Sequence, residues 1–355
     1  MAGDRPVTAD GPVGGSGPVG GPAWLDEIPL RRIVEANLLT RVPLPPGDRP
    51  LVDPGAVLLP GDVLFEHLRD RRIAEVDVKV AEADRPPAGS RWSPVPGRRR
   101  RERGTEGELL APMAGRGSRW RLVTGEHRVG VAAVVGGIVV EVRPGAEIRL
   151  RVDGLAIRGA FAAGAAARGR LELATDPFGD LRPGGIDVGR AGSILVVGSR
   201  IDAEALTRAR AMGVHGIVVA TLPGKELRDF QASERRQRAA LHPAEPFGVL
   251  VLDGAMRRPI PTPVIALLER LAGREVALLT DPPALVFSAE DSELPVVPAD
   301  WVRVRSGPNA GAEGRLGGLA GLRRFAAGVH LEAATVAFDG EPPIDIPIGD
   351  LERLA

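Results

Sequence analysis

Residues 193–220 read SILVVGSRIDAEALTRARAMGVHGIVVA. The apolar run at each end is typical of a buried strand, and a helix-length segment separates the two runs. Asp202 is a favoured residue for the start of a helix, and Gly213 is a favoured residue directly after one. The stretch therefore predicts a strand, a tight turn, a helix that begins after Asp202 and ends near Met212, and a second strand.

The same alternation continues toward the C-terminus. Two more helix-length segments, Lys225–Leu241 and Pro263–Leu271, are each followed by an apolar run. Strands that alternate with helices at this spacing predict a small parallel sheet with right-handed crossovers. We expect one α/β domain over residues 186–290, with parallel strands at about 193–197, 216–220, 247–252 and 275–279.

The rest of the chain is predicted to be β-rich. The 46 glycines and 33 prolines among 355 residues favour short strands and many turns. Residues 57–64 predict a strand, a turn and a strand, and 138–152 predict a hairpin with Ile138, Val140 and Val142 on its buried face. Leu171 and Leu173 suggest a further strand of that sheet. A single short helix is predicted at Leu30–Asn37.

These patterns predict a multi-domain, mostly β protein with one α/β unit. The predicted segments are a disordered Gly/Pro-rich leader (1–22), a β domain (23–135) with an Arg/Pro loop (83–106), a β extension (136–185), the α/β domain (186–290) and a C-terminal β barrel (291–355).

Composition excludes several classes of protein. The 46 basic and 46 acidic residues balance, so no global positive charge attracts nucleic acid. Cysteine is absent, which excludes disulfides and thiolate metal sites, and the five histidines lack metal-ligand spacing. No apolar segment is long enough to span a bilayer. We therefore expect a cytoplasmic chain with no metal, no cofactor and no membrane span.

Gly198, Ser199 and Arg200 are the candidate ligand-binding residues. They follow the first strand of the α/β domain, where ligands of open α/β sheets usually bind. A phosphate there would meet the N-terminus of the following helix, and Arg200 would supply positive charge. The alternative is that Gly198 and Ser199 only form the turn.

Ala111-Pro112-Met113-Ala114-Gly115 resembles the entry into the barrel-sandwich hybrid fold of biotinyl and lipoyl carrier domains, and a similar barrel opens RnfC-like redox subunits. The resemblance implies this barrel within 23–135. Carriers of this kind attach their cofactor to a lysine at a hairpin tip, whereas Lys79 lies in an apparent strand and no other lysine precedes Lys225. We therefore predict no biotin or lipoate. The cysteines that bind the clusters of RnfC-like subunits are also absent from this chain.

Residues 302–314, VRVRSGPNAGAEG, resemble the KOW motif of NusG-type elongation factors and some ribosomal proteins. The resemblance implies an SH3-like barrel over 291–355, with Leu316–Gly328 as a glycine-rich insertion. KOW domains contact RNA, ribosome or polymerase. The candidate partner-binding residues are Trp301, Arg303, Arg305, Arg323, Arg324 and Phe325.

The four arginines would bind RNA if they share one face, whereas Trp301 and Phe325 would contact a protein. Eight acids outnumber six arginines over Asp300–Ala355, which favours a protein partner while RNA or a ribonucleoprotein stays possible. Trp301 has a second interpretation, as a plug at the barrel end. The domain order as a whole is similar to a family of uncharacterised bacterial multi-domain proteins. We expect a non-enzymatic scaffold or adaptor; the alternative is a small-molecule or anion sensor, or an enzyme, with its site at the strand ends of 186–290.

Overall fold

The computed structural model describes residues 23–77, 90–92, 107–112, 119–238, 246–291 and 294–355. They form two compact units. The terminal unit joins the beginning of the chain, up to Arg32, to Val296–Ala355, and the central unit comprises Ile33–Pro295. The predicted leader 1–22, Lys79, and the predicted loop 83–106 apart from residues 90–92 lie outside the described residues.

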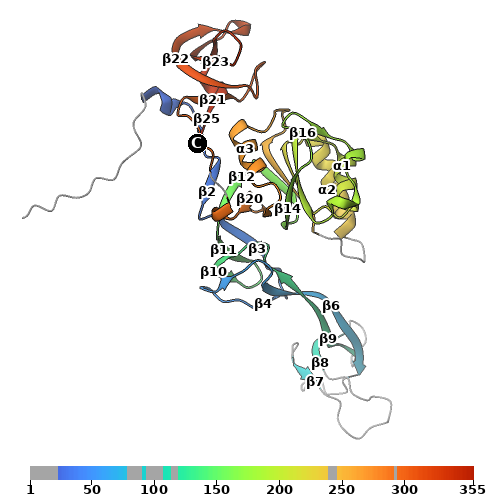
Figure 1. Cartoon of the computed structure of the whole chain (residues 1–355). Helices are drawn as coiled ribbons and strands as arrows, with labels where there is room; N and C mark the ends of the chain where they lie inside the picture. The colour runs from blue at the N-terminus through green and yellow to red at the C-terminus, as the bar shows by residue number, and fades with distance from the viewer. Residues whose placement is uncertain (1–22, 78–89, 93–106, 113–118, 239–245, 292–293) are drawn as a thin grey trace, which may run out of the picture. The chain divides into compact units, whose positions relative to one another are not determined.

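The central unit contains a ten-stranded sheet in the order β13-β18-β17-β16-β14-β19-β20-β12-β2, with β15 beside β16 (Figure 1). Strands β14, β16, β17 and β18 are mutually parallel, as expected for an α/β sheet. The sheet nevertheless includes strands from all three predicted segments between 23 and 290. The bounds are β2 Val34–Ala36, β12 Leu155–Arg158, β13 Phe161–Gly164, β14 Ala167–Leu173, β15 Asp180–Leu181, β16 Ser193–Ile201, β17 Gly216–Thr221, β18 Gly248–Gly254, β19 Glu275–Thr280 and β20 Pro283–Phe287.

The prediction of a parallel strand at 275–279 is wrong, because β19 runs antiparallel to both β14 and β20. Backbone hydrogen bonds of Leu171 with Gly273 and Arg274 hold the start of β19 beside the carboxyl half of β14. The strand then has to run back along β14. Alternation of apolar runs with helices predicts the order of elements but not the direction of each strand.

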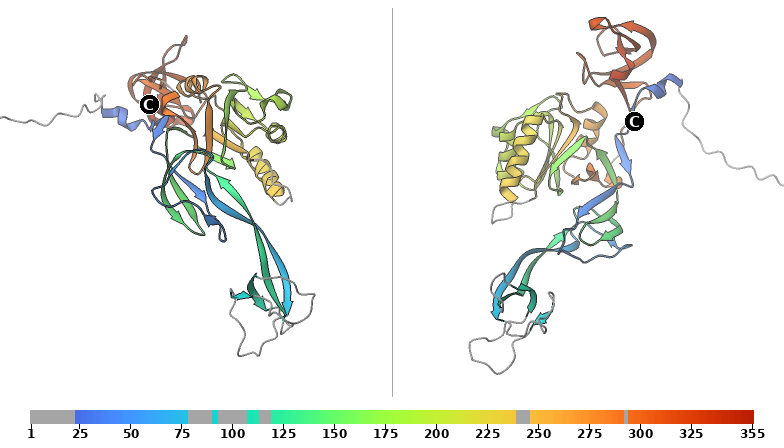
Figure 2. Two further views of the ribbon diagram at one scale, coloured as in Figure 1. Left: turned by 60° about the horizontal axis from the view of Figure 1, so that its bottom comes forward. Right: turned by 180° about the vertical axis from the view of Figure 1, so that it is seen from behind.

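Two helices, α1 (Ala203–Ala211) and α2 (Gly224–Arg238), cover one face of the parallel strands, and α3 (Thr262–Arg270) lies on the opposite face (Figure 2). Alternate side chains of β16, β17 and β18 form a buried core with α1 and α2. The predicted caps of α1 are confirmed: an Asp202 carboxylate oxygen accepts a hydrogen bond from the Ala205 N–H at 2.7 Å, and Gly213 follows the helix at a φ of 78°.

A four-stranded sheet of the central unit has the order β3 (Leu39–Pro43), β11 (Glu147–Val152), β10 (Gly137–Arg143) and β5 (Val57–Leu58). The predicted hairpin at 138–152 is confirmed. Its predicted buried face is wrong in β10, where Val139 is buried while Ile138 and Val140 are exposed. Three consecutive β-branched residues make both faces apolar, so alternation alone does not identify the inner one. Leu171 and Leu173, expected in this sheet, belong to β14 of the ten-stranded sheet.

Strands β6 (Val63–Asp77) and β9 (Arg119–Ala132) pair along their length as a two-stranded ribbon (Figure 1). Short strands complete this sheet: β4 (Arg49–Pro50), β8 (Gly107–Pro112) and β7 (Arg91–Trp92). The predicted turn between β5 and β6 is confirmed, because the Asp62 carboxylate accepts the Leu59 N–H at 2.7 Å. Residues 113–115 of the carrier-like motif lie outside the described residues.

The terminal unit contains a six-stranded sheet in the order β1 (Leu30–Arg31), β25 (Leu351–Leu354), β21 (Trp301–Val304), β22 (Glu313–Arg324), β23 (His330–Ala337) and β24 (Ile344–Pro347). This path of hydrogen-bonded strands does not close into a barrel among the described residues. The helix predicted at Leu30–Asn37 is wrong, since this segment contributes β1 to one sheet and β2 to another. Pairing with distant strands overrides the local helical preference.

The predicted insertion at Leu316–Gly328 is largely a continuation of β22, which forms a long hairpin with β23. Two register shifts interrupt this pairing, and they fall at Gly318 and Gly321, which have φ values of 148° and 68°. Glycine adopts these positive φ angles without steric cost, so the glycine-rich sequence bends the hairpin and does not end it.

Candidate functional site

The carboxyl ends of β16, β17 and β18 lie at one edge of the parallel sheet, where the candidate residues Gly198, Ser199 and Arg200 are found. They do not form the predicted turn, because β16 continues to Ile201 and pairs there with β15. The sequence gives no local sign of this pairing, since β15 consists of only two residues.

The backbone N–H groups of these residues are already bonded. The Gly198 N–H donates to the Thr175 hydroxyl at 2.8 Å, and the Ser199 N–H donates to the Gly179 carbonyl at 2.8 Å. A Cβ atom at Gly198 would lie 2.0 Å from the Asp176 carbonyl oxygen. The glycine is therefore required for close packing of the 175–179 loop on β16, and these two N–H groups are not available to cradle a phosphate.

The N-terminus of α1 is occupied by carboxylates of the chain itself. Besides the Asp202 cap, a Glu226 oxygen from α2 accepts the Ala203 N–H at 2.8 Å, and the other oxygen lies 3.4 Å from the Arg200 guanidinium. Negative charge at a helix N-terminus is stabilising. Glu226 thus takes the place that the predicted anion would have, and Arg200 is paired with the same carboxylate.

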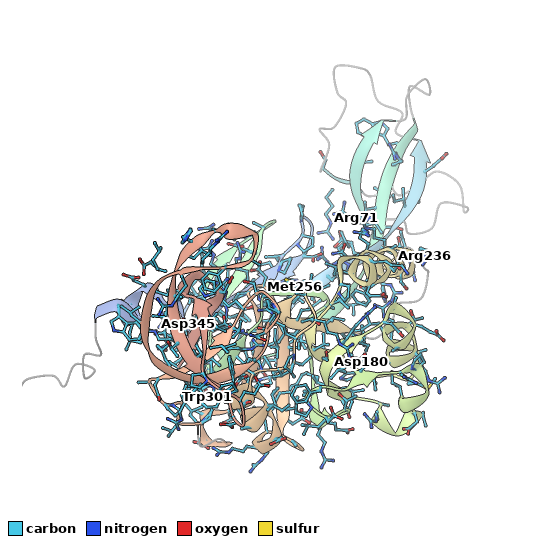
Figure 3. All side chains as sticks on the ribbon, turned by 90° about the horizontal axis from the view of Figure 1, so that it is seen from above. Arg71, Asp180, Arg236, Met256, Trp301 and Asp345 are labelled. Carbon is cyan, nitrogen blue, oxygen red and sulfur yellow. The ribbon has the colours of Figure 1, made fainter. Side chains whose placement is uncertain are left out.

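Arg257, which sequence analysis missed, completes this cluster. Its guanidinium donates to the buried Ser199 hydroxyl at 3.2 Å and to the Asp180 carboxylate at 3.1 Å; Asp180 is labelled in Figure 3. Arg257 lies 58 residues beyond Ser199 in the sequence, so no short-range spacing reveals it. Within the described part of the chain, the Ser199 hydroxyl contacts this cationic donor and no base, and activation of a nucleophile requires a base.

The histidines have separate surroundings. His67 lies 3.0 Å from Asp48, and the His215 ring bonds the Arg168 carbonyl at 2.6 Å. Among the described residues, no group of three or more His, Asp or Glu side chains is arranged to hold a metal ion. Within the same part of the chain, no helix is long and apolar enough to cross a membrane.

In the terminal unit, Arg303 is fully buried, so it is not available as the predicted partner-binding residue, and the four arginines do not form the single exposed face that RNA binding would need. Its guanidinium lies 3.4 Å from Glu352 on β25 and 3.9 Å from Glu313 on β22. The central position of β21 between these strands places both carboxylates beside it. Arg303 therefore has a structural role in this sheet.

Trp301 is half-buried, and its indole N–H donates to the Glu313 carboxylate at 3.0 Å, so it shares the network of Arg303. Arg305, Arg323 and Arg324 are exposed, and Phe325 is half-buried. Arg323 donates to Asp345 at 2.7 Å, and this hydrogen bond holds the pKa of the Asp345 carboxyl below its usual range. Asp345 is labelled in Figure 3.

The β22–β23 hairpin also carries a cluster that sequence analysis missed. Four large apolar residues in and beside its two strands are exposed: Leu319, Leu322, Val329 and Leu331. Leu322, the most exposed, has 60% of its surface accessible. We call these four residues the hairpin cluster; they are distributed over both faces of the hairpin, because Leu322 pairs with Glu332 whereas Leu331 pairs with the adjacent Arg323. The glycine-rich sequence around them predicts a loop insertion, whereas the structure places most of it in paired strands.

No protein-family model matches the chain, and no curated protein sequence matches it.

Proposed function

We propose that the chain is a non-enzymatic scaffold or adaptor that binds a protein through the terminal unit. The hairpin cluster carries this proposal. Exposed large apolar side chains that are concentrated along one hairpin favour protein association. The resemblance of residues 302–314 to KOW motifs supports the same use, because domains with that motif contact large assemblies. An SH3-like barrel for this unit, a barrel-sandwich hybrid within 23–135 and a cytoplasmic location stay predictions.

A protein partner fits this surface better than RNA. Binding to phosphates requires several exposed cations on one face. Arg303 is buried, Arg323 is paired with Asp345, and Arg315 is paired with Asp300 at 3.1 Å. The hairpin thus offers more exposed apolar surface than unpaired positive charge.

The alternative, a ligand site at the strand ends of 186–290, has less support. The N–H groups of Gly198 and Ser199 and the N-terminus of α1 are bonded within the chain. A small anion would have to displace Glu226 or Asp180 from its arginine. We therefore place the ligand-binding and enzymatic hypotheses second.

The test is quantitative affinity capture from host lysate with the full chain as bait. Leu322→Ser is the test variant, and Ile73→Ser is the matched control, because Ile73 is an exposed apolar strand residue on β6, outside the hairpin, with 51% of its surface accessible. We expect one set of captured proteins to fall about tenfold with Leu322→Ser, which corresponds to about 1.4 kcal/mol. Ile73→Ser should leave that set unchanged.

Three results contradict the proposal. Nuclease treatment that removes the captured proteins would favour RNA as the partner. Equal loss with both variants would show non-specific apolar capture. Normal capture with Leu322→Ser, in a variant shown by circular dichroism to be folded, would exclude the hairpin cluster as the docking surface.

A further inference from the structure

The outer face of the four-stranded sheet in the central unit carries a row of exposed side chains. Leu39 on β3 pairs with Arg151 on β11, Arg151 pairs with Ile138 on β10, and Ile138 pairs with Val57 on β5. Directly paired residues of neighbouring antiparallel strands point to the same face of a sheet. The three apolar members have 52%, 42% and 75% of their surface exposed for Leu39, Ile138 and Val57. We call this row the Arg151 row.

The opposite face of the same strands is a buried core. Leu58, Val139 and Leu150 alternate with the exposed residues and pack together away from solvent. Antiparallel sheets with one solvated face usually carry polar residues there, whereas apolar residues on both faces are typical of sheets covered on both sides. The outer face of this sheet therefore combines exposed apolar residues with the charged residues Arg41, Glu147 and Arg149.

Arg151 differs from the neighbouring arginines on this sheet. Arg149 lies 2.6 Å from Glu147 and 3.3 Å from Glu141, and Arg143 lies 2.6 Å from Glu141. The exposed Arg151 has no carboxylate partner among the described residues. The middle of the apolar row thus holds one positive charge that nothing in this part of the chain neutralises.

A hollow of about 470 Å³ adjoins the row. Leu39, Arg41 and Arg149 line it together with Arg158 and the Asp281–Pro282 turn. Leu39, Arg41 and Arg149 belong to the outer face of the sheet, because they alternate with buried Thr40 and Leu150. The row and the hollow therefore share Leu39 and form one continuous surface.

We propose that this surface docks a protein segment in which a carboxylate is flanked by apolar side chains. The carboxylate meets Arg151, and the apolar side chains cover Leu39, Ile138 and Val57. Arginine surrounded by apolar contacts is a favourable centre for a protein interface, because exclusion of water strengthens the charge-assisted hydrogen bonds. The site lies in the other unit from the hairpin cluster and is independent of it.

Two other occupants fit the surface less well. A second copy of the chain, docked through the same face, would bring a second Arg151 and no carboxylate of the row to the interface. Nucleic acid would find a single unpaired cation among apolar residues, whereas phosphate binding uses several.

The experiment is an in vitro display selection of random short peptides against the immobilised full chain. Enriched peptides are then titrated against the wild type, Arg151→Glu, Ile138→Ser and Arg72→Glu. Arg72 is the matched control, since it is exposed on β6 of the same unit, outside the row. Circular dichroism and thermal unfolding verify that each variant is folded.

We expect the enriched peptides to carry Asp or Glu beside apolar residues. Their affinity should fall about tenfold or more with Arg151→Glu and with Ile138→Ser, and it should change little with Arg72→Glu. A peptide whose carboxylate is replaced by arginine should bind Arg151→Glu better than it binds the wild type, because the charge pair is then reversed.

Four outcomes overturn the proposal. They are the absence of any enriched peptide, enrichment of neutral or basic peptides, and equal loss with Arg151→Glu and Arg72→Glu. The fourth is a concentration-dependent dimer, measured by analytical ultracentrifugation, that dissociates with Ile138→Ser, which would make a second copy the occupant.

Discussion

Ile28→Ala tests whether the beginning of the described chain is an integral part of the terminal unit. Ile28 is fully buried in a core whose other buried members lie between Val302 and Leu351. Its neighbours along the chain, Leu30 and Arg31, form β1 beside β25. More than 270 residues of sequence separate Ile28 from Val302, the next buried member of this core.

The expected cost follows from the size of the side chain that is lost. Isoleucine to alanine removes three carbon atoms, which is about 2.4 kcal/mol of burial at about 0.8 kcal/mol for each carbon. The residual cavity adds to this cost, and such substitutions span about 2–5 kcal/mol. A change of about 3 kcal/mol lowers the ratio of folded to unfolded molecules about 150-fold. Because all buried members of this core belong to the terminal unit, we expect the loss of stability to be confined to that unit.

The assay is hydrogen exchange followed by mass spectrometry, read on peptides from 296–355 and from the central unit separately. Protection should fall in β21, β23 and β25 and be unchanged in β16–β18. Leu30→Ala is the control, because Leu30 is adjacent in sequence and half-exposed, and substitutions of this kind are usually within about 0.5 kcal/mol. Equal protection in the two variants would refute the reasoning and would allow the terminal unit to fold without residues 23–31.

Two further predictions concern single contacts. Gly198→Ala should lower the free energy of unfolding by about 1–3 kcal/mol in a denaturant titration, because its Cβ would overlap the Asp176 backbone. Gly184→Ala is the control and should change this free energy little, because the space around the new Cβ is open. Equal effects of the two substitutions would contradict the packing of the 175–179 loop on β16. Arg323→Gln should raise the pKa of the Asp345 carboxyl, measured by nuclear magnetic resonance titration, toward its ordinary value. The lowered pKa in the wild type stabilises the fold at neutral pH, and this contribution is lost as the pH falls through that pKa; an unchanged pKa in the variant would contradict the role of the hydrogen bond.

Elements determined by local sequence were predictable. The α1 helix has its N-cap at Asp202 and its terminating glycine at Gly213, and both signals act within a few residues of the helix ends. The β10–β11 hairpin likewise depends on a short connection between two apolar strands. In each case the residues that decide the structure are neighbours along the chain.

Features determined by distant residues were not predictable. The alternation of Val302, Arg303 and Val304 suggests that the arginine faces solvent. Burial of Arg303 requires Glu352, which lies 49 residues later, and no pattern in the intervening sequence identifies that partner. Arg257 reaches Ser199 across a similar separation. Both failures concern charged side chains whose surroundings are built by other strands.

The groups at the α/β strand ends are bonded within the chain, whereas large apolar side chains on the sheet faces are exposed. At the strand ends, where an α/β enzyme would leave N–H groups free for substrate, Thr175, Gly179 and Glu226 take up the N–H groups of Gly198, Ser199 and Ala203. On the sheet faces, the hairpin cluster and the Arg151 row leave large apolar side chains exposed to water. Burial of that apolar surface is favourable and needs no precisely placed reacting group, which is the chemistry of protein association. The exposed apolar surfaces of the two β-rich parts therefore support the proposed protein association, and the hydrogen bonds at the α/β strand ends stabilise the sheet.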